Sequence, residues 1–252
     1  MWFSRRRGVD LPDDWPDLAR RYVRAWRRLD DDERAVVADV ARDLVTTRRW
    51  EASRGFEITD RMRVVVALQA GVLALGLDEG CYRDVGSIIL HPTTVRVDRT
   101  TAGPVPGTES CGSVDLLGEA VFDGPVVIAW DSASTSARHP ERGTDVVFHE
   151  LAHKIDMLDG TIDGTPPLDP GPSIDRWVEV NTRVFEHLVD HDDPVIDGYG
   201  ATDAGEFFAV VTEHFMTVPD ELVAAHPELY DLYRDVYGQD PLARLERPLR
   251  RD

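Results

Sequence analysis

The chain has 252 residues, of which 42% are hydrophobic, and this composition excludes a disordered protein because it suffices for a packed core. Its formal net charge of −19 excludes a general nucleic-acid binder, since phosphate groups repel an acidic surface. Two cysteines are too few for a disulfide framework or a cysteine zinc site.

The N-terminal part of the chain is expected to be helical. Amphipathic or apolar patterns predict helices over residues 17–28, 31–49 and 60–76. Asp30 or Asp31 is a candidate N-cap for the second helix, and Asp60 is one for the third. The segment "GFEIT" (55–59) is expected to form a short strand.

No membrane segment is expected. The basic N-terminus "MWFSRRRGVDLPDDWPDL" is not followed by an apolar run, so it does not resemble a secretory signal. The most apolar stretch, "VVVALQAGVLALGL" (64–77), is too short to span a bilayer and is predicted to be a core helix. We therefore expect a soluble, cytoplasmic protein.

Strand patterns occupy the middle of the chain, and helical patterns follow them. The β-branched runs are "VGSIILHP", "TVRVD", "SVDLLGEAVFDG" and "PVVIAWDS" (125–132). "FDGP" is the expected turn between the last two runs. Helices are predicted over 144–158, 173–190, 204–217 and 219–236. We expect one α+β domain over residues 1–252, with a helical part to about residue 80. A small mixed sheet and a helical C-terminal part carry the active site over about 81–252.

The segment "VVFHELAHKID" (146–156) contains the pattern H-E-x-x-H. His149 and His153 are four residues apart, so a helix places both imidazoles on one face, where they can bind one metal ion. Glu150 is placed to take a proton from a metal-bound water and pass it to a leaving amine. The alternative is a core helix whose histidines bond to the backbone or to carboxylates.

A catalytic zinc needs a third protein ligand and one open position. The metzincin continuation is absent, because Asp156 and Asp159 stand where its glycine and third histidine would be. A glutamate on a later helix is the simplest source. The candidates are Glu179, Glu186, Glu206 and Glu213. The first two lie on a helix that could be ordinary and amphipathic, with a solvated acidic face. The apolar segment "GEFFAVVTEHFM" favours Glu206 or Glu213, since charged groups are seldom buried unless paired or metal-bound. Spacing alone does not choose between them.

Two further side chains could serve such a site. Asp156, one turn after His153, could accept the second ring N–H of a ligand histidine and hold its orientation. The alternative for Asp156 is an exposed acid in the last helical turn. Tyr199, in a glycine-rich loop before Glu206, could hydrogen-bond the oxyanion of a tetrahedral intermediate. The alternative for Tyr199 is an ordinary loop tyrosine.

Three segments together resemble the Mlc titration factor A family: "HELAHKIDMLDG", "YGATDAGEFFAVVTEHF" and "VPDEL". The resemblance includes "RGFEIT", "GPVVIAW" and "YGQDPLARL", so it covers most of the chain. This is a bacterial family of zinc-dependent peptidases whose catalytic part is similar to the protease domain of anthrax lethal factor. The resemblance therefore implies a zincin-like metallopeptidase domain of the gluzincin type.

The resemblance also implies roles for individual residues. His149 and His153 match the two histidine ligands of one zinc ion per chain, and Glu150 matches the catalytic base. Glu206 matches the glutamate ligand, and Tyr199 matches the tyrosine that supports the transition state.

The expected function is zinc-dependent hydrolysis of a peptide or protein substrate, with the aminopeptidase-like activity of the family. One alternative is a regulatory binding protein that sequesters a transcriptional repressor, as the best-known family member does, with peptidase activity secondary. Another is a purely structural helical protein, with or without a metal ion. The substrate is expected as an added strand along a sheet edge near "PVVIAWDS" (125–132), unless that strand is interior.

Overall fold

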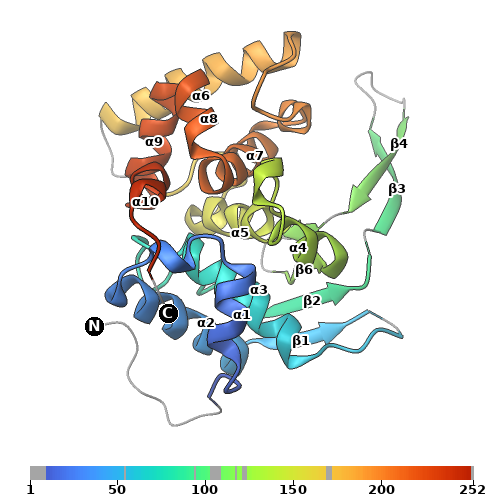
Figure 1. Ribbon diagram of the computed structural model, residues 1–252. Helices are drawn as coiled ribbons and strands as arrows, with labels where there is room; N and C mark the ends of the chain where they lie inside the picture. Colours follow the sequence, from blue (N-terminus) through green and yellow to red (C-terminus); the bar gives the residue numbers. More distant parts are fainter. Residues whose placement is uncertain are drawn as a thin grey trace.

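The molecule combines many helices with a small sheet, which makes it an α+β protein (Figure 1). The computed structural model describes residues 10–53, 55–93, 95–102, 109–116, 118–120, 124–168 and 172–250. The N-terminal helices and the sheet lie on one side of the helix with the H-E-x-x-H pattern, and the C-terminal helices lie on the other (Figure 1).

The helices and strands alternate irregularly along the chain. The α-helices are α1 (Trp15–Tyr22), α2 (Asp31–Thr47), α3 (Asp60–Leu73), α4 (Trp130–Ser136), α5 (Val146–Asp156), α6 (Pro172–Asp190), α7 (Ala204–Thr217), α8 (Pro219–Ala225), α9 (Pro227–Tyr237) and α10 (Pro241–Glu246). The short 3-10 helices are η1 (Trp26–Arg28), η2 (Pro140–Arg142), η3 (Met157–Asp159) and η4 (Gly198–Ala201). The strands are β1 (Arg49–Ala52), β2 (Ser87–His91), β3 (Val95–Ala102), β4 (Glu109–Leu116), β5 (Gly118–Ala120) and β6 (Val126–Ala129).

The main sheet has the strand order β1-β2-β6-β5, in which the first three strands are parallel and β5 is antiparallel to β6. This is the small mixed sheet expected from the sequence. The expectation that the strand in "PVVIAWDS" lies at an edge is wrong, because β6 pairs with β2 on one side and with β5 on the other. Strands β3 and β4 form a separate antiparallel pair that extends away from the helices (Figure 1).

Several predicted boundaries differ from the structure. "GFEIT" is not a strand, and β1 occupies residues where the second helix was expected to end. β1 exists because it pairs with β2, with Trp50 opposite Ile88, and local propensity does not reveal such a distant partner. Helices α4 and α10 were not expected, and the third helix is capped by Thr59 rather than Asp60. The expected "FDGP" turn falls partly outside the described residues.

The first and the last predicted helices are each divided into shorter helices in the structure. The first expected helix ends at Tyr22 and resumes only as η1. The last expected helix splits into α8 and α9 at His226, whose backbone is not helical. The cause is Pro227, because a proline disfavours the α conformation in the preceding residue and favours the first position of a new helix.

Helix α3 forms the centre of the N-terminal part. It packs against α1, α2 and α5, and every residue from Val64 to Leu73 is buried. The α2–α3 contact is close enough to require Gly71, since a Cβ there would lie 2.7 Å from the carbonyl oxygen of Val37. Helix α2 begins with a capping box, in which Asp30 accepts from the backbone of Glu33 and Glu33 accepts from the backbone of Asp30.

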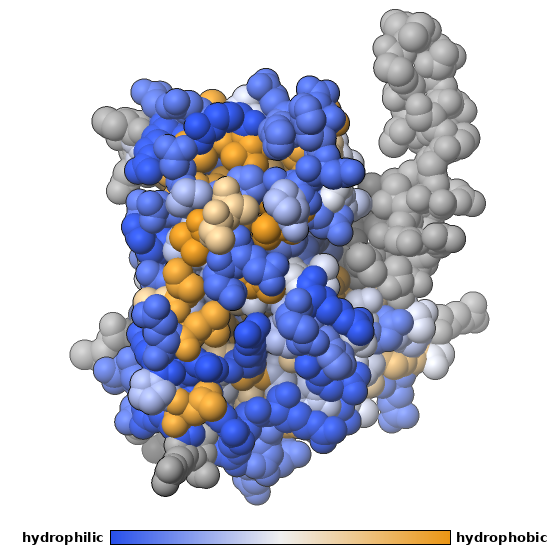
Figure 2. Space-filling view, turned by 45° about the horizontal axis from the view of Figure 1, so that its top comes forward, coloured by the Kyte–Doolittle hydropathy of each residue, from blue (hydrophilic) through white to orange (hydrophobic). Residues whose placement is uncertain are grey.

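The C-terminal end of the described chain returns to the N-terminal helices. The backbone N–H of Arg250 donates to the carbonyl of Arg27, and the Arg28 side chain donates to the carbonyl of Leu245. The face shown in Figure 2 is mostly hydrophilic, with apolar residues gathered in separate patches. Among the described helices, none is both long enough and apolar enough to cross a membrane.

Candidate metal centre

Two helices bring the candidate ligands together. α5 begins at Asp145, whose side chain accepts hydrogen bonds from the backbone N–H groups of Val147 and Phe148. Apolar residues bury α5 between α3, the sheet and α7. α7 begins at Asp203, which caps the backbone N–H of Glu206 at 2.9 Å. These caps fix the first turns of both helices, where His149 and Glu206 lie.

The structure places His149, His153 and Glu206 around one point. The Nε2 atoms of the two histidines are 3.3 Å apart. The Oε2 atom of Glu206 lies 3.0 Å from Nε2 of His149 and 3.6 Å from Nε2 of His153. Within the described residues, these three side chains form the one group of histidine, cysteine and acidic residues with metal-ligand spacing.

These distances fit a tetrahedral metal ion. Ligand bonds of about 2.0–2.1 Å in tetrahedral geometry put neighbouring ligand atoms about 3.3 Å apart. The three observed separations lie within 0.3 Å of that value. A core helix whose histidines only bond to carboxylates does not need two imidazole nitrogens and a carboxylate oxygen converging on one point. Two imidazoles, one carboxylate and an open fourth position form the donor set of a catalytic zinc site.

The electrostatics of the centre favour a positive charge. Burial alone would lower the pKa of His149, but hydrogen bonds to Glu206 and Glu213 raise it well above its usual value. Burial alone would raise the pKa of Glu206, but the two histidines hold it well below its usual range. The same negative groups that hold a proton on this imidazole would attract a metal cation in its place.

Glu150 and Tyr199 lie next to the candidate ligands. Glu150 follows His149 in α5 and is 2% exposed, and its charge acts on both His149 and Tyr199. The ring of Tyr199 lies 6.0 Å from the ring of His149, and 42% of the residue is exposed. Burial of part of the residue and then the charge of Glu206 raise the pKa of Tyr199, so its phenol stays a hydrogen-bond donor.

The η4 segment fixes the backbone of Tyr199. The Asp197 side chain accepts from the Tyr199 backbone N–H at 2.8 Å, and the Thr202 hydroxyl donates to the Tyr199 carbonyl at 2.7 Å. Gly200 lies directly behind the tyrosine, where a Cβ would be 3.3 Å from the Leu188 side chain. The absence of a side chain at Gly200 therefore permits η4 to pack closely on α6.

The other candidate ligands lie elsewhere. Glu179 and Glu186 are exposed on α6, as expected for the solvated face of an amphipathic helix. Glu213 lies on α7 but contacts Nδ1 of His149, at 2.8 Å, on the opposite side of the ring from Glu206. Its second oxygen accepts the backbone N–H of Asp145.

The expected role of Asp156 is wrong. Asp156 is fully buried rather than exposed, and its Oδ2 atom accepts the backbone N–H of Gly164 at 3.0 Å instead of a histidine ring N–H. The carboxylate that contacts Nδ1 of the candidate ligand His149 is Glu213. Asp145 and Gln69 were not expected from the sequence: Asp145 caps the start of α5, and Gln69 donates a hydrogen bond to the Asp145 side chain. A signal for Gln69 existed, because it is a single polar residue inside an apolar helix and such a residue needs a buried partner.

Comparison with known proteins agrees with a metal-binding role for this group of side chains. The model of the family described as glucose-regulated metallo-peptidase M90 matches residues 1–238. Mlc titration factor A of Serratia proteamaculans is 31% identical over 226 residues, which cover 87% of this chain and 85% of the relative. Mlc titration factor A of Yersinia enterocolitica is 28% identical over 254 residues, with 98% and 93% covered. An uncharacterized protein of Synechocystis sp. is 29% identical over 236 residues, with 92% and 86% covered.

Proposed function

We propose that this chain, which belongs to the glucose-regulated metallopeptidase family M90, is a zinc-dependent peptidase of the gluzincin type. His149, His153 and Glu206 would hold one zinc ion per chain. The observation that carries the proposal is the convergence of their three ligand atoms at tetrahedral spacing in a member of a metallopeptidase family.

The reaction is hydrolysis of a peptide bond. When bound, zinc would polarise the scissile carbonyl and acidify a water molecule. Glu150 accepts a proton from this attacking water, whose oxygen forms a bond to the carbonyl carbon. Glu150 then donates the proton to the leaving nitrogen as the carbon–nitrogen bond breaks. The Tyr199 hydroxyl donates a hydrogen bond to the oxyanion that develops on the former carbonyl oxygen.

The substrate would bind along β5, at the end of the main sheet. Among the described strands β5 pairs with β6 alone, and α5 packs against both strands. An extended peptide that adds to the free side of β5 would pass next to α5, which carries His149 and Glu150. The resemblance to Mlc titration factor A favours aminopeptidase action, in which only a peptide with a free N-terminus is cleaved.

The test of the proposal compares the wild type with Glu150→Gln and His149→Ala. The wild type is expected to contain one zinc per chain and to cleave peptides from a library. Glu150→Gln is expected to keep zinc and lose cleavage, because the base is removed and the ligands remain. His149→Ala is expected to lose both. Cleavage at the wild-type rate by either variant, or a wild type without stoichiometric zinc, would overturn the proposal.

A second candidate function rests on the printed name of the relatives, Mlc titration factor A. It is the sequestration of a transcriptional repressor by this chain, with peptidase activity secondary. Equal binding of a repressor by the wild type and Glu150→Gln would show that binding does not depend on catalysis. Absence of any binding would leave the peptidase function alone.

A further inference from the structure

Glu213 lies directly behind the candidate metal centre. It is 7% exposed, and its two carboxylate oxygens face two different groups of the α5 helix. Oε1 lies 2.8 Å from Nδ1 of His149, and Oε2 accepts the backbone N–H of Asp145. Glu213 therefore joins the ligand side chain to the backbone at which its helix begins.

The contact with Nδ1 determines which nitrogen of His149 can bind a metal. A neutral imidazole carries its proton on one nitrogen only, and an ionised carboxylate can only accept a hydrogen bond. With Nδ1–H donated to Glu213, the lone pair is on Nε2, which is the nitrogen that faces His153 and Glu206. The ring is also held in the plane that directs Nε2 to this point.

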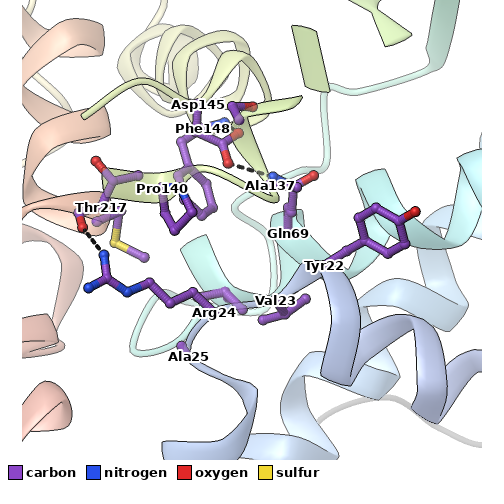
Figure 3. Close-up of a pocket in the computed structure, with 13 residues that line it drawn as sticks. Tyr22, Val23, Arg24, Ala25, Gln69, Ala137, Pro140, Asp145, Phe148 and Thr217 are labelled. Atoms are coloured by element: carbon purple, nitrogen blue, oxygen red, sulfur yellow. Dashed lines mark hydrogen bonds between the residues drawn. The ribbon is translucent and has the colours of Figure 1, made fainter. Parts of the chain in front are cut away.

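Glu213 is itself held by a line of buried polar groups, which runs from His149 through Glu213 and Asp145 to Gln69 in the N-terminal part. Asp145, whose backbone N–H it accepts, caps α5 through Val147 and Phe148. The other oxygen of the Asp145 side chain accepts from Nε2 of Gln69 at 2.5 Å, and Gln69 belongs to α3. Figure 3 shows Gln69 and Asp145 bonded to each other in the wall of a small cavity.

This cavity is separate from the candidate ligands. Its volume is about 40 Å³, and its lining includes Gln69, Asp145 and Phe148 but neither the candidate ligand histidines nor Glu206. A space of this size holds a few water molecules at most. Glu213 does not line this cavity, so the open space adjoins the Gln69–Asp145 end of the line and not the contact with His149.

We propose that Glu213 is a positioning residue that fixes the tautomer and the orientation of His149 for zinc binding. The inference rests on the proposed function, because it takes His149 as a zinc ligand. Outer carboxylates of this kind typically contribute 10- to 100-fold to metal affinity. A purely structural Glu213, which only anchors the start of α5, would instead contribute equally to the stability of the protein with and without metal.

The decisive variant is Glu213→Gln, which keeps the length of the side chain and removes its charge. Zinc affinity is measured on the full chain by competition with a chelator at constant pH. We expect zinc to bind 10- to 100-fold more weakly to Glu213→Gln than to the wild type. Wild-type affinity in this variant, beside lost binding in His149→Ala, would overturn the inference and leave the proposed function intact. A wild type that binds no zinc would overturn both.

The matched control is Thr212→Val on the same helix. Thr212 is buried and its hydroxyl pairs with the Tyr237 hydroxyl at 2.8 Å, away from the metal centre. We expect this variant to unfold at a lower temperature and to bind zinc like the wild type. An equal loss of zinc affinity in Thr212→Val would assign the effect of Glu213→Gln to general destabilisation and would overturn the inference.

A second measurement needs no variant. Nitrogen-15 NMR of the zinc-loaded wild type reports which imidazole nitrogen of each histidine carries a proton and which binds the metal. We expect His149 to bind zinc through Nε2 and to carry its proton on Nδ1. Binding of zinc through Nδ1 would overturn the inference whether or not Glu213→Gln folds.

Discussion

At the scale of single residues, Tyr199 is the side chain whose chemistry can be separated from metal binding. Its ring lies near His149, and the role proposed for its phenol is to bind the oxyanion and not the metal. We predict that Tyr199→Phe lowers kcat by about 10²- to 10³-fold, which is the usual effect of losing one donor to an oxyanion. Zinc affinity should stay at the wild-type value. Steady-state kinetics and a chelator competition check both statements, and a kcat equal to that of the wild type would show that the phenol takes no part.

The buried carboxyl of Asp156 predicts a pH dependence of stability. Burial, and then the charges of Asp163 and Asp159, raise its pKa from 3.8 to about 6 in spite of the hydrogen bond from Gly164. Because the folded state binds this proton more tightly than the unfolded state, ionisation removes stability as pH rises from about 4 to about 6. A shift of this size corresponds to about 3 kcal/mol.

The variant Asp156→Asn tests this dependence. The amide keeps an acceptor for the Gly164 N–H and cannot ionise. We therefore expect the stability of the variant relative to the wild type to rise by about 3 kcal/mol between pH 4 and pH 7. Urea unfolding of the zinc-free proteins measures the difference between their free energies of unfolding. The ionisable groups of the candidate metal centre contribute equally to both proteins and therefore cancel. Parallel pH profiles for the two proteins would contradict the prediction.

The ambiguity between Glu206 and Glu213 shows where sequence reasoning ends at this scale. The two residues are seven positions apart, which is close to two helical turns, so both lie on the same face of α7. Both contact His149, one at Nε2 and the other at Nδ1. Which nitrogen each carboxylate faces depends on how α7 crosses α5, and no local pattern contains that information.

At the scale of elements, the segment after α5 packs directly against the backbone at the beginning of α7. Gly164 has a positive φ of 74°, and a Cβ there would lie 2.2 Å from the carbonyl oxygen of Ala204. A left-handed conformation by itself costs a residue with a Cβ roughly 1–2 kcal/mol. We predict that Gly164→Ala lowers the free energy of unfolding by more than this amount. The reason is that the helix start must also move away from the new methyl group.

Gly160→Ala is the matched control for this prediction. Gly160 also has a positive φ, of 98°, but nothing lies within 4 Å of the position of its Cβ. Its substitution should therefore cost only the conformational strain. Thermal unfolding of the two variants gives the comparison, and equal losses would show that the approach of Gly164 to Ala204 does not matter.

The elements with strong local signals were predicted closely, and those that depend on distant partners were not. α7 was expected over 204–217 and has these bounds, because it has an Asp203 cap and a continuous apolar pattern. β1 was missed because only its pairing with β2 makes it a strand. The position of β6 inside the sheet depends on the return of β5, which lies close to it in the chain but runs antiparallel.

At the scale of the whole molecule, the candidate metal centre depends on both helical parts. α5 contacts α3 and the sheet on one side and α7 on the other, and the line from Gln69 to Glu213 crosses it. The sequence was sufficient for the α+β class and for the family, because the motifs are specific. It could not give the order of strands or the second contact of His149, which arise only when segments far apart in the chain are packed together.

The zinc X-ray absorption spectrum of the full chain, loaded with one equivalent of the metal, tests the central claim most directly. The claim is that His149, His153 and Glu206 hold the ion. It predicts two imidazole nitrogens and one carboxylate oxygen at about 2.0–2.2 Å, with a fourth light atom in the open position. His149→Ala should lose one imidazole from the spectrum. A sulfur ligand at about 2.3 Å, or an imidazole contribution that survives in His149→Ala unchanged, would contradict the account.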